Sequence, residues 1–414
     1  MQKTFDTHIE KTILGNGLTV ISEAIPSLRS VSLGVWVKTG TRFEEEYNNG
    51  IAHFLEHMVF KGTKRRSAFK IAQSLEEVGG SLNAYTSKEL TVYYAHILDF
   101  QLAKGVNVLS DMICNSLFRD IDIEKEKQVV FEEISAVRDT PDEYIFDLFQ
   151  EKMYPDQPIG FPILGTLETV KNFNRQKLMD FWTKYYCPDN IIVAAAGNLK
   201  HEKLVKLVEK NFELNNRLSE VSFCPPKASS HISLAYDEPV NQTHICAGLE
   251  SLSYLAENRY DLIALNTHIG GGMSSKLFQI IREKHGLAYS VYSFVDFFRD
   301  TGMFSFYLGT DKNNQKKALR ILFQEINKLN QKEINLSRVA KIKEQMKGNF
   351  LLGLETSNRR MSRLAKNEIY YGRQIELSEL LEKIDFITPQ SLLNMARSIF
   401  DMDKMNVIML NPTN

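Results

Sequence analysis

An approximate internal repeat constrains the fold of this 414-residue chain more than any other feature. The same order of predicted elements occurs twice, at an offset of 214 residues: an amphipathic helix, a short polar turn and a buried strand, in residues 174–198 and again in residues 388–412. The alternating segments 30–37 and 243–249 are similar at nearly the same offset. Two such matches, in a chain about twice the length of an ordinary domain, indicate two homologous domains.

The boundary between these domains is predicted at residues 215–230. This stretch contains Pro225-Pro226, shows little hydrophobic periodicity and separates a helical pattern from an alternating one. Such a composition is typical of a linker. The expected organisation is therefore an N-terminal domain over 1–214 and a C-terminal domain over 231–414.

Strands and helices mix in each half without a regular alternation. The first half contains predicted strands at 17–25, 30–37, 81–86 and 91–98, and predicted helices at 68–78, 101–115 and 122–139. We expect the first two strands to pair as a hairpin across Pro26-Ser27. This pattern predicts an α+β fold, in which each domain has a mainly antiparallel sheet with helices packed on one face.

The run His53-Phe54-Leu55-Glu56-His57 is the strongest chemical signal in the sequence. On a helix, residues four apart share a face, so His53 and His57 can offer two imidazoles to one metal ion. Glu56 points to the same side and is placed to deprotonate a metal-bound water. His-x-x-Glu-His is a known zinc-peptidase pattern.

An ordinary amphipathic helix is the alternative explanation of this run. Phe54, Leu55 and Met58 would suit a core-facing stripe, with the histidines on a polar face. Burying three ionisable groups without a metal is costly, however. The motif therefore favours a metal site, with zinc as the expected ion.

A tetrahedral zinc site needs a third protein ligand. The predicted helix at 123–138 is rich in carboxylates, and Glu126 and Glu133 lie two turns apart on one face, while Glu132 points elsewhere by about 100°. A solvated acidic face explains this pattern equally well. Periodicity alone leaves the third ligand open.

The surroundings of the motif resemble a known family. Gly50-Ile51-Ala52 precedes it, Phe60-Lys61-Gly62-Thr63 follows it, and Asn83-Ala84-Tyr85-Thr86 lies beyond. With the downstream glutamate pair, this resembles the pitrilysin/insulysin-type inverzincin metallopeptidases, in particular the two-domain bacterial members that are similar to the mitochondrial processing peptidase. The resemblance implies that Glu133, 76 residues after His57, is the last metal ligand. It implies that Glu126 is the accessory glutamate supporting the site.

A glycine run, Gly270-Gly271-Gly272, precedes a predicted helix at 276–283. It lacks the spacing of a P-loop or a dinucleotide-binding loop, so nucleotide binding is the weakest hypothesis. Farther on, Arg282 and Tyr289 stand in a segment that resembles the family's R-x-x-x-G-L-A-Y sequence. The resemblance implies that both reach the substrate and hydrogen-bond the scissile carbonyl as it becomes an oxyanion.

The resemblance also implies how substrate and chains assemble. Asn83 and Ala84 match an edge strand that binds peptide backbone beside the metal. The two domains are expected to form a clamshell around a closed chamber, with one zinc ion per chain. Two chains are expected to associate as a homodimer, or as a heterodimer with an inactive homologue.

The implied function is that of a zinc-dependent endopeptidase acting on unfolded peptides or presequence-like segments. The alternative from another class is a non-catalytic structural subunit of the same fold, like the core proteins of respiratory complexes. Those proteins have degenerate metal residues, whereas this chain retains the full set.

Composition limits the other possibilities. Fifty Lys and Arg nearly cancel 51 Asp and Glu, so no global field favours nucleic acid or an anionic membrane. No apolar run reaches the length of a membrane span. The four cysteines are far apart and form no CxxC pair, which is typical of reduced thiols. With no secretory signal near Met1, we expect a cytoplasmic protein.

Overall fold

A computed structural model describes residues 8–214, 218–219 and 223–413, and divides the chain into two compact units. The first unit comprises Met1–Ser135, Phe161–Phe223 and Gly353–Gln374, and the second comprises Ala136–Gly160, Cys224–Leu352 and Ile375–Asn414. The change of unit at Phe223–Cys224 falls inside the predicted linker, parts of which lie outside the described residues. Each unit also contains a segment from the opposite half of the sequence. The units therefore differ from the predicted contiguous domains at 1–214 and 231–414.

The first unit is built on a six-stranded sheet with the order β1-β2-β6-β3-β5-β4. Its strands are β1 His8–Ile13, β2 Thr19–Ala24, β3 Ser30–Val37, β4 Ser81–Thr86, β5 Thr91–Leu98 and β6 Ile191–Gly197. Only β2 and β6 run parallel; the other neighbours are antiparallel. The sheet is therefore mainly antiparallel, as predicted.

The predicted hairpin between the first two long strands is wrong, because β6 lies between β2 and β3. All seven residues of β6 are buried. A strand that is apolar on both faces is stable only in the middle of a sheet, where both of its edges are paired and both faces are covered. The residues of the turn at Pro26-Ser27 do not indicate that a distant strand, β6, lies between the two strands that the turn connects.

Helices cover one face of the first sheet. They are α1 Ile51–Val59, α2 Ala68–Glu76, α3 Leu102–Asn115, α4 Asp120–Arg138, α6 Leu167–Lys171, α7 Arg175–Tyr185 and α8 His201–Asn211. Alternate strand residues such as Val35 and Val193 join these helices in one buried core. The residues between them, such as Trp36 and Ile192, point to the opposite face.

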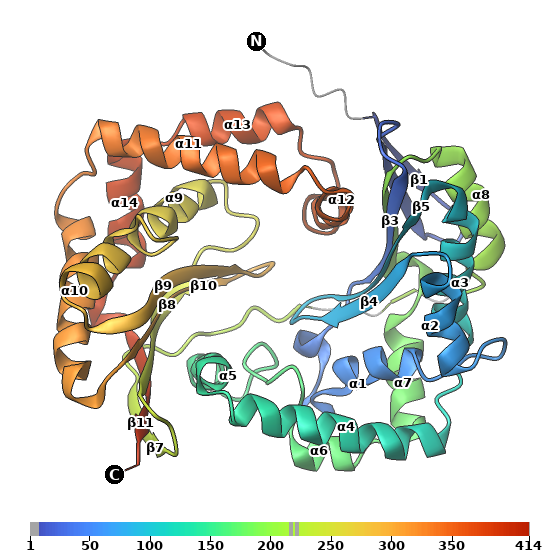
Figure 1. The fold of residues 1–414 in the computed structure, drawn as a ribbon, viewed down its shortest axis with the longest axis horizontal. Coiled ribbons are helices and arrows are strands. Elements are labelled where there is room, and N and C mark those ends of the chain that lie inside the picture. The colour runs from blue at the N-terminus through green and yellow to red at the C-terminus, as the bar shows by residue number, and fades with distance from the viewer. Residues whose placement is uncertain (1–7, 215–217, 220–222, 414) are drawn as a thin grey trace. The chain divides into compact units, whose positions relative to one another are not determined.

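That opposite face is covered by α12 (Ser357–Tyr371), which comes from the C-terminal half of the sequence (Figure 1). Its Met361, Leu364 and Ala365 are buried against Trp36 and its neighbours. Two ion pairs to the strands of this sheet accompany the packing: Arg360 binds Glu23 and Lys11 binds Glu368. Helices therefore lie on both faces, one more layer than the sequence predicted.

The second unit repeats this plan on a five-stranded sheet with the order β7-β11-β8-β10-β9. Its strands are β7 Ser233–Glu238, β8 Thr243–Ser251, β9 Ala288–Phe297, β10 Gly302–Thr310 and β11 Asn406–Pro412. The main core also contains α9 Arg259–Ile269, α10 Gln315–Gln331, α11 Leu336–Gly353, α13 Leu377–Asp385 and α14 Pro389–Ile399. The other face is covered by α5 (Pro141–Met153), from the N-terminal half of the sequence (Figure 1).

The two units are related by the repeat seen in the sequence. The helix-turn-strand segment of α7 and β6 corresponds to that of α14 and β11, and in each sheet this last strand is parallel to one neighbour and antiparallel to the other. The prediction of two homologous α+β domains is confirmed. Within the described residues, no helix combines the length and hydrophobicity needed to cross a bilayer.

Candidate metal centre

The metal motif lies on α1, a nine-residue helix with two distinct faces. Ile51, Phe54 and Leu55 are at most 1% exposed and pack into the core of the first unit. His53, Glu56 and His57 are only partly buried and share the remaining face. The helix therefore combines the two patterns that the sequence left as alternatives: a core-facing stripe and a polar site.

The start of α1 is held by a carboxylate from outside the helix. Glu44 accepts hydrogen bonds from Asn49 Nδ2 at 2.9 Å, from Gly50 N at 2.8 Å and from Ala52 N at 2.8 Å. The N-cap residue Gly50 has a φ of 92°, and a Cβ there would approach Leu164 O to 2.6 Å, so only glycine fits. Burial raises the pKa of Glu44 to about 7, against the lowering effect of these hydrogen bonds.

His53, His57 and Glu133 converge on one point, with one ligand atom from each within 4.8 Å of the others. Glu133 Oε2 lies 3.8 Å from His53 Nε2 and 3.7 Å from His57 Nε2. Ligands at zinc-bond length around a tetrahedral ion are about 3.4 Å apart. The three side chains are thus near the separation that a shared ion requires.

The protein alone leaves part of this set unsatisfied. Among the residues that the structure describes, neither of the buried atoms His53 Nδ1 and Glu133 Oε2 has a hydrogen-bond partner. Burial, reinforced by the neighbouring His57, lowers the pKa of His53 to about 3, so this imidazole is held in the neutral form that a metal binds. An orphaned buried carboxylate oxygen beside two imidazoles fits a divalent cation with nitrogen and oxygen ligands.

Glu126 supports His57 from the side away from the convergence point. The Nδ1–H of His57 donates to Glu126 Oε1 at 2.8 Å, which leaves Nε2 directed at Glu133. The other oxygen of Glu126 pairs with the ammonium of Lys61. Burial opposes ionisation of Glu126, but the contacts with His57 and Lys61 outweigh it and lower the pKa of this carboxyl. Such a carboxylate fixes the tautomer and orientation of a ligating histidine.

Glu56 is placed beside the three converging residues. Its Oε2 accepts a hydrogen bond from the Thr86 hydroxyl at the end of β4. Burial raises the pKa of Glu56, and the charge of Glu133 adds to this effect, while Thr86 and His57 oppose it. A carboxyl with a raised pKa is suited to accept and return a proton near neutral pH.

The edge strand that carries the predicted peptide-binding residues is β4, which, of the strands in the described residues, pairs only with β5. Asn83 is exposed, whereas Ala84 is half-buried and packs against the core of the unit. The strand contacts α1, and its last residue, Thr86, donates to Glu56, so the strand ends beside the metal motif. The structure therefore places Asn83 and Ala84 on an unpaired strand edge of the unit that carries the metal residues.

Arg282 and Tyr289 belong to the second unit and contact each other. Arg282 lies on a π-helical turn, Phe278–Lys284, and its guanidinium is 4.5 Å from the centre of the Tyr289 ring. Tyr289, on β9, is 77% exposed. Both residues line a pocket of about 370 Å³ with Gln242 and Asp311. They form a paired donor group, one cation and one phenol.

The glycine run before this turn has a packing role. A Cβ at Gly270 would approach Ser293 N to 2.3 Å, and one at Gly271 would approach Thr267 Cα to 2.8 Å. Gly270 therefore lets the end of α9 approach β9, and Gly271 lets the chain fold back closely on the last turn of α9. Gly270 and Gly271 thus have packing roles that need no nucleotide, whereas a Cβ at Gly272 would meet no atom within 4 Å, and its φ of 153° favours glycine by itself.

Sequence reasoning missed three supporting residues: Glu44, Lys61 and Thr86. Lys61 lies one turn beyond His57, a spacing that points it to the same side, and this was the only available signal for it. Glu44 caps α1 from the irregular segment just before the helix, five to eight residues away, and Thr86 reaches Glu56 from 30 residues farther along the chain. Those contacts have no sequence pattern.

Fold and site together define a duplicated sheet-and-helix protein with a histidine, histidine and glutamate cluster in its first unit. Residues 19–167 match the family model described as insulinase (peptidase family M16), and residues 172–346 match the model described as peptidase M16 inactive domain. The chain belongs to peptidase family M16. All three converging residues lie in the first matched segment.

Similar proteins cover nearly the whole chain. A Bacillus subtilis protein named zinc protease YmxG is 39% identical over 95% of this chain and 96% of its own length. Proteins named zinc proteases from Streptomyces coelicolor and Rickettsia felis are 36% and 37% identical, each over 94% of this chain and over 87% and 94% of their own lengths. A Helicobacter pylori protease structure shares the fold, with a TM-score of 0.90, 24% identity and coverage of 98% of this chain and 100% of that one.

Proposed function

We propose that the protein is a zinc-dependent endopeptidase that hydrolyses unfolded peptides or presequence-like segments. The observation that carries this proposal is the convergence of His53, His57 and Glu133 around a point where a buried carboxylate oxygen has no hydrogen-bond partner in the described part of the chain. The names of the relatives, all zinc proteases, support the same ion and the same reaction.

In this proposal, His53, His57 and Glu133 hold one zinc ion per chain. Bound zinc supplies a Lewis acid that polarises a peptide carbonyl and lowers the pKa of a water molecule. Glu56 takes the proton of the attacking water at Oε1, the oxygen that Thr86 does not contact, and passes it to the leaving amine. Glu126 keeps His57 in the tautomer that presents Nε2.

The substrate assignment rests on β4 and on the Arg282–Tyr289 pair. The free edge of β4 can pair with an extended peptide through the backbone of Asn83 and Ala84, and only an unfolded segment offers such a strand. Arg282 and Tyr289 are assigned as donors to the scissile carbonyl as negative charge develops. We propose that two chains form a homodimer with a closed chamber, which would exclude folded proteins.

The replacement of Glu56 by glutamine tests the proposal. Glu56→Gln should retain one zinc per chain, measured by mass spectrometry of metals, and lose about 10²- to 10⁴-fold in cleavage of a quenched unfolded peptide, because the proton acceptor is gone. Glu132→Gln is the matched control, because Glu132 is an exposed acid beside Glu133 and its loss should change neither quantity. Wild-type turnover in Glu56→Gln, or a purified protein that binds no zinc, would contradict the proposal. The second outcome would favour a structural subunit.

A further inference from the structure

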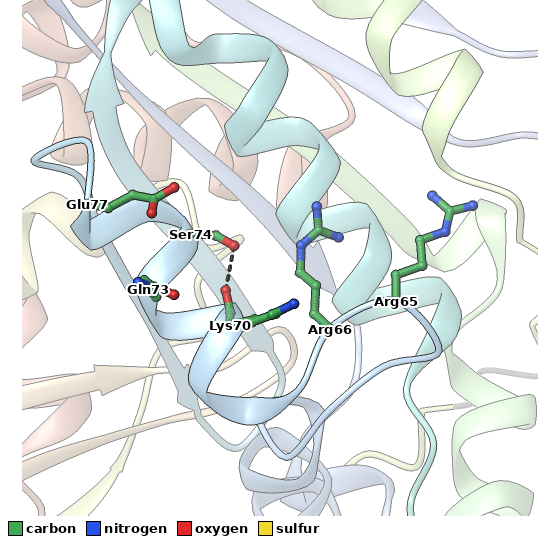
Figure 2. Close-up of a pocket in the computed structure, with 6 residues that line it drawn as sticks. All are labelled: Arg65, Arg66, Lys70, Gln73, Ser74 and Glu77. Carbon is green, nitrogen blue, oxygen red and sulfur yellow. Dashed lines mark hydrogen bonds between the residues drawn. The ribbon is translucent and has the colours of Figure 1, made fainter.

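A strongly basic pocket lies on the first unit, at the turn that follows α1. Residues 61–75 contain five Lys and Arg and no Asp or Glu, although the whole chain has a net charge of −1. The turn and the first residues of α2 form the wall of a pocket of about 440 Å³, whose charged lining is entirely cationic: Lys64, Arg65, Arg66, Lys70 and Arg119. The adjoining pocket, of about 340 Å³, shares three of these cations and adds one carboxylate, Glu77, whose charge is paired with Lys104 at 2.7 Å (Figure 2).

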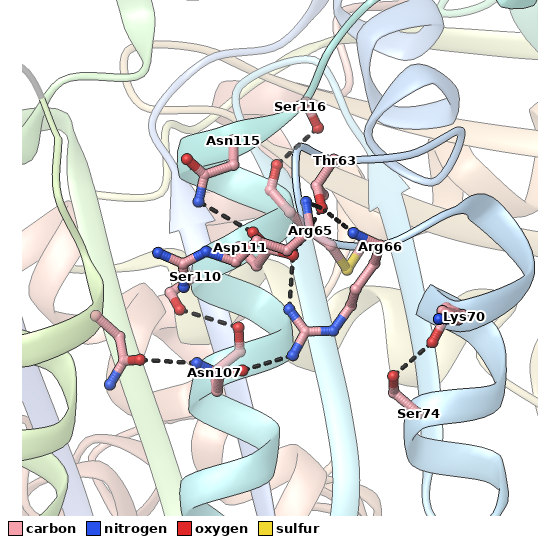
Figure 3. A network of polar contacts seen from close by, with 12 residues as sticks. Thr63, Arg65, Arg66, Lys70, Ser74, Asn107, Ser110, Asp111, Asn115 and Ser116 are labelled. Carbon is pink, nitrogen blue, oxygen red and sulfur yellow. Dashed lines mark hydrogen bonds and ion pairs between the residues drawn. The ribbon is translucent and has the colours of Figure 1, made fainter.

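The turn that carries the pocket is held rigidly. Thr63 Oγ1 accepts hydrogen bonds from the backbone N–H groups of Arg65 at 3.0 Å and Arg66 at 2.9 Å, and donates to the buried Asp111 at 2.7 Å (Figure 3). Lys64 N donates to Asn115 O at the end of α3. The backbone around the pocket is therefore fixed before any ligand arrives, which lowers the entropic cost of binding.

Two of the five cations are already neutralised by the protein. Arg66 donates to Asp111 Oδ2 at 2.6 Å and also to Asn107, so its charge serves to compensate a buried carboxylate (Figure 3). Arg119 pairs with Asp122 at 2.6 Å. Among the described residues, Lys64, Arg65 and Lys70 have no carboxylate partner, and all three are exposed. About three positive charges in the pocket are thus uncompensated.

We infer that this pocket binds the diphosphate group of a small phosphate-bearing ligand. A terminal phosphate carries about −1.5 to −2 charges at neutral pH, and a linked second phosphate adds about one, which matches the three uncompensated cations. The planar guanidinium of Arg65 suits two phosphate oxygens at once, and the lysine ammonium groups act as point charges beside it. The two adjoining pockets that share Arg65 and Lys70 offer room for two linked phosphates.

Binding of inorganic pyrophosphate to the zinc-loaded protein tests the inference. Isothermal titration calorimetry at constant ionic strength should show one site per chain, and the affinity should fall at least tenfold in the double variant Arg65→Gln/Lys70→Gln. Arg66 is left in place because its removal would leave the buried Asp111 without its cationic partner. The matched control is Lys203→Gln/Lys206→Gln, which removes two exposed lysines from α8 of the same unit and should leave the affinity unchanged. Pyrophosphate can also bind zinc, but both double variants keep the proposed zinc ligands, so this effect should be the same in all three proteins and should cancel in the comparison.

A comparison of different anions tests whether the pocket recognises a diphosphate group. Pyrophosphate and ADP should bind with similar affinity, whereas sulfate at the same ionic strength should not compete. Equal loss of affinity in both double variants, or equal competition by sulfate, would overturn the inference, because it would show only general attraction to positive charge. Binding of ADP without pyrophosphate would overturn it too, as would binding of anionic vesicles or RNA that millimolar pyrophosphate does not displace.

Discussion

Single contacts around His57 determine how well the first unit can hold a metal ion. Glu126 is 3% exposed and lies between two hydrogen-bonding partners, the ring of His57 and the ammonium of Lys61. Without Lys61, this buried carboxylate would keep one partner only, and desolvation would favour its protonated form. A protonated Glu126 is a poorer acceptor for the Nδ1–H of His57, so the Nε2 atom would be less firmly directed at the site.

Replacement of Lys61 should therefore weaken metal binding without touching a ligand. Lys61→Met should lower the zinc affinity about tenfold, measured by competition with a fluorescent chelator, while Lys61→Arg should retain most of it. Lys64→Met serves as the control, because Lys64 lies three residues away and pairs with no carboxylate among the described residues. Equal affinity in Lys61→Met and Lys64→Met would rule out this role.

The sequence was sufficient for one part of the site and insufficient for the other. Helical spacing alone brings His53, Glu56 and His57 to one face, and the structure bears this out. Periodicity did not choose Glu133 among the acids of α4; only the family resemblance did. The reason is physical: the sequence pattern of a helix shows which residues share a face, but Glu133 differs from the other acids of α4 in lying near His53 and His57, which belong to another helix.

At the scale of elements, α1 depends on Glu44 for its starting point. This carboxylate replaces the missing side-chain cap at Gly50 and satisfies two backbone N–H groups in a place that water does not reach. Unsatisfied buried donors each cost about 1–3 kcal/mol. A shift in the first turn would also move His53, which follows directly.

Removal of this cap should lower both the stability of the protein and its affinity for zinc. Glu44→Ala should lower the free energy of unfolding of the apoprotein by about 2–4 kcal/mol in urea titrations, and should reduce the zinc affinity of the folded protein. Glu46→Ala removes an exposed acid from the same loop and should change stability by less than about 0.5 kcal/mol. A stable Glu44→Ala protein with unchanged zinc affinity would show that α1 does not need the cap.

A buried histidine on α9 makes the second unit sensitive to acid. His268 is 4% exposed and its Nδ1 accepts a hydrogen bond from Arg338 Nε at 3.3 Å. Burial, reinforced by the charges of Arg338 and Lys276, lowers the pKa of His268 to about 4. The unfolded chain, with a histidine pKa near 6.5, binds more protons between these two values, so stability falls as the pH drops from about 6.5 to 4.

His268→Gln should remove part of this acid sensitivity. The wild-type protein should lose on the order of 3 kcal/mol through His268 between pH 6.5 and 4, and the variant should lose that much less. Urea unfolding at pH 7, 5.5 and 4.5 measures the difference. His285→Gln, at an exposed position of the same unit, should follow the wild-type curve. Parallel curves for wild type and His268→Gln would refute the assignment.

At the scale of the whole molecule, the sequence predicted the duplication but not the exchange of helices. The shared order of helix, turn and strand placed α7–β6 and α14–β11 correctly, because both segments fold from local patterns. An amphipathic helix shows that it has an apolar face, but not which sheet that face will cover. The assignment of α5 and α12 to units in the opposite halves therefore required the structure.

This exchange makes the first unit dependent on the C-terminal half of the chain. Without α12, the sheet face around Trp36, Val92 and Ile192 would meet water, and the buried Glu23 would lose its partner Arg360. An exposed apolar face of this kind promotes aggregation, and an unpaired buried charge is strongly destabilising. The contact can be weakened in the intact chain as well as removed by truncation.

Truncation of the chain before α12 and substitution within α12 should both destabilise the first unit. Residues 1–223 expressed alone should be insoluble or bind a hydrophobic dye, and co-expression with residues 224–414 should restore a soluble complex.

In the intact chain, Leu364→Asp should destabilise the first unit by about 3 kcal/mol or more and increase amide exchange in β2 and β6, although the altered residue is far along the chain. Asn358→Asp, at an exposed position of α12, should leave exchange unchanged. If the fragment 1–223 alone unfolds as cooperatively as the whole protein, α12 only covers the sheet. If it needs the other half, α12 completes the core beneath the metal-motif residues, and the first unit cannot fold without the C-terminal half of the chain.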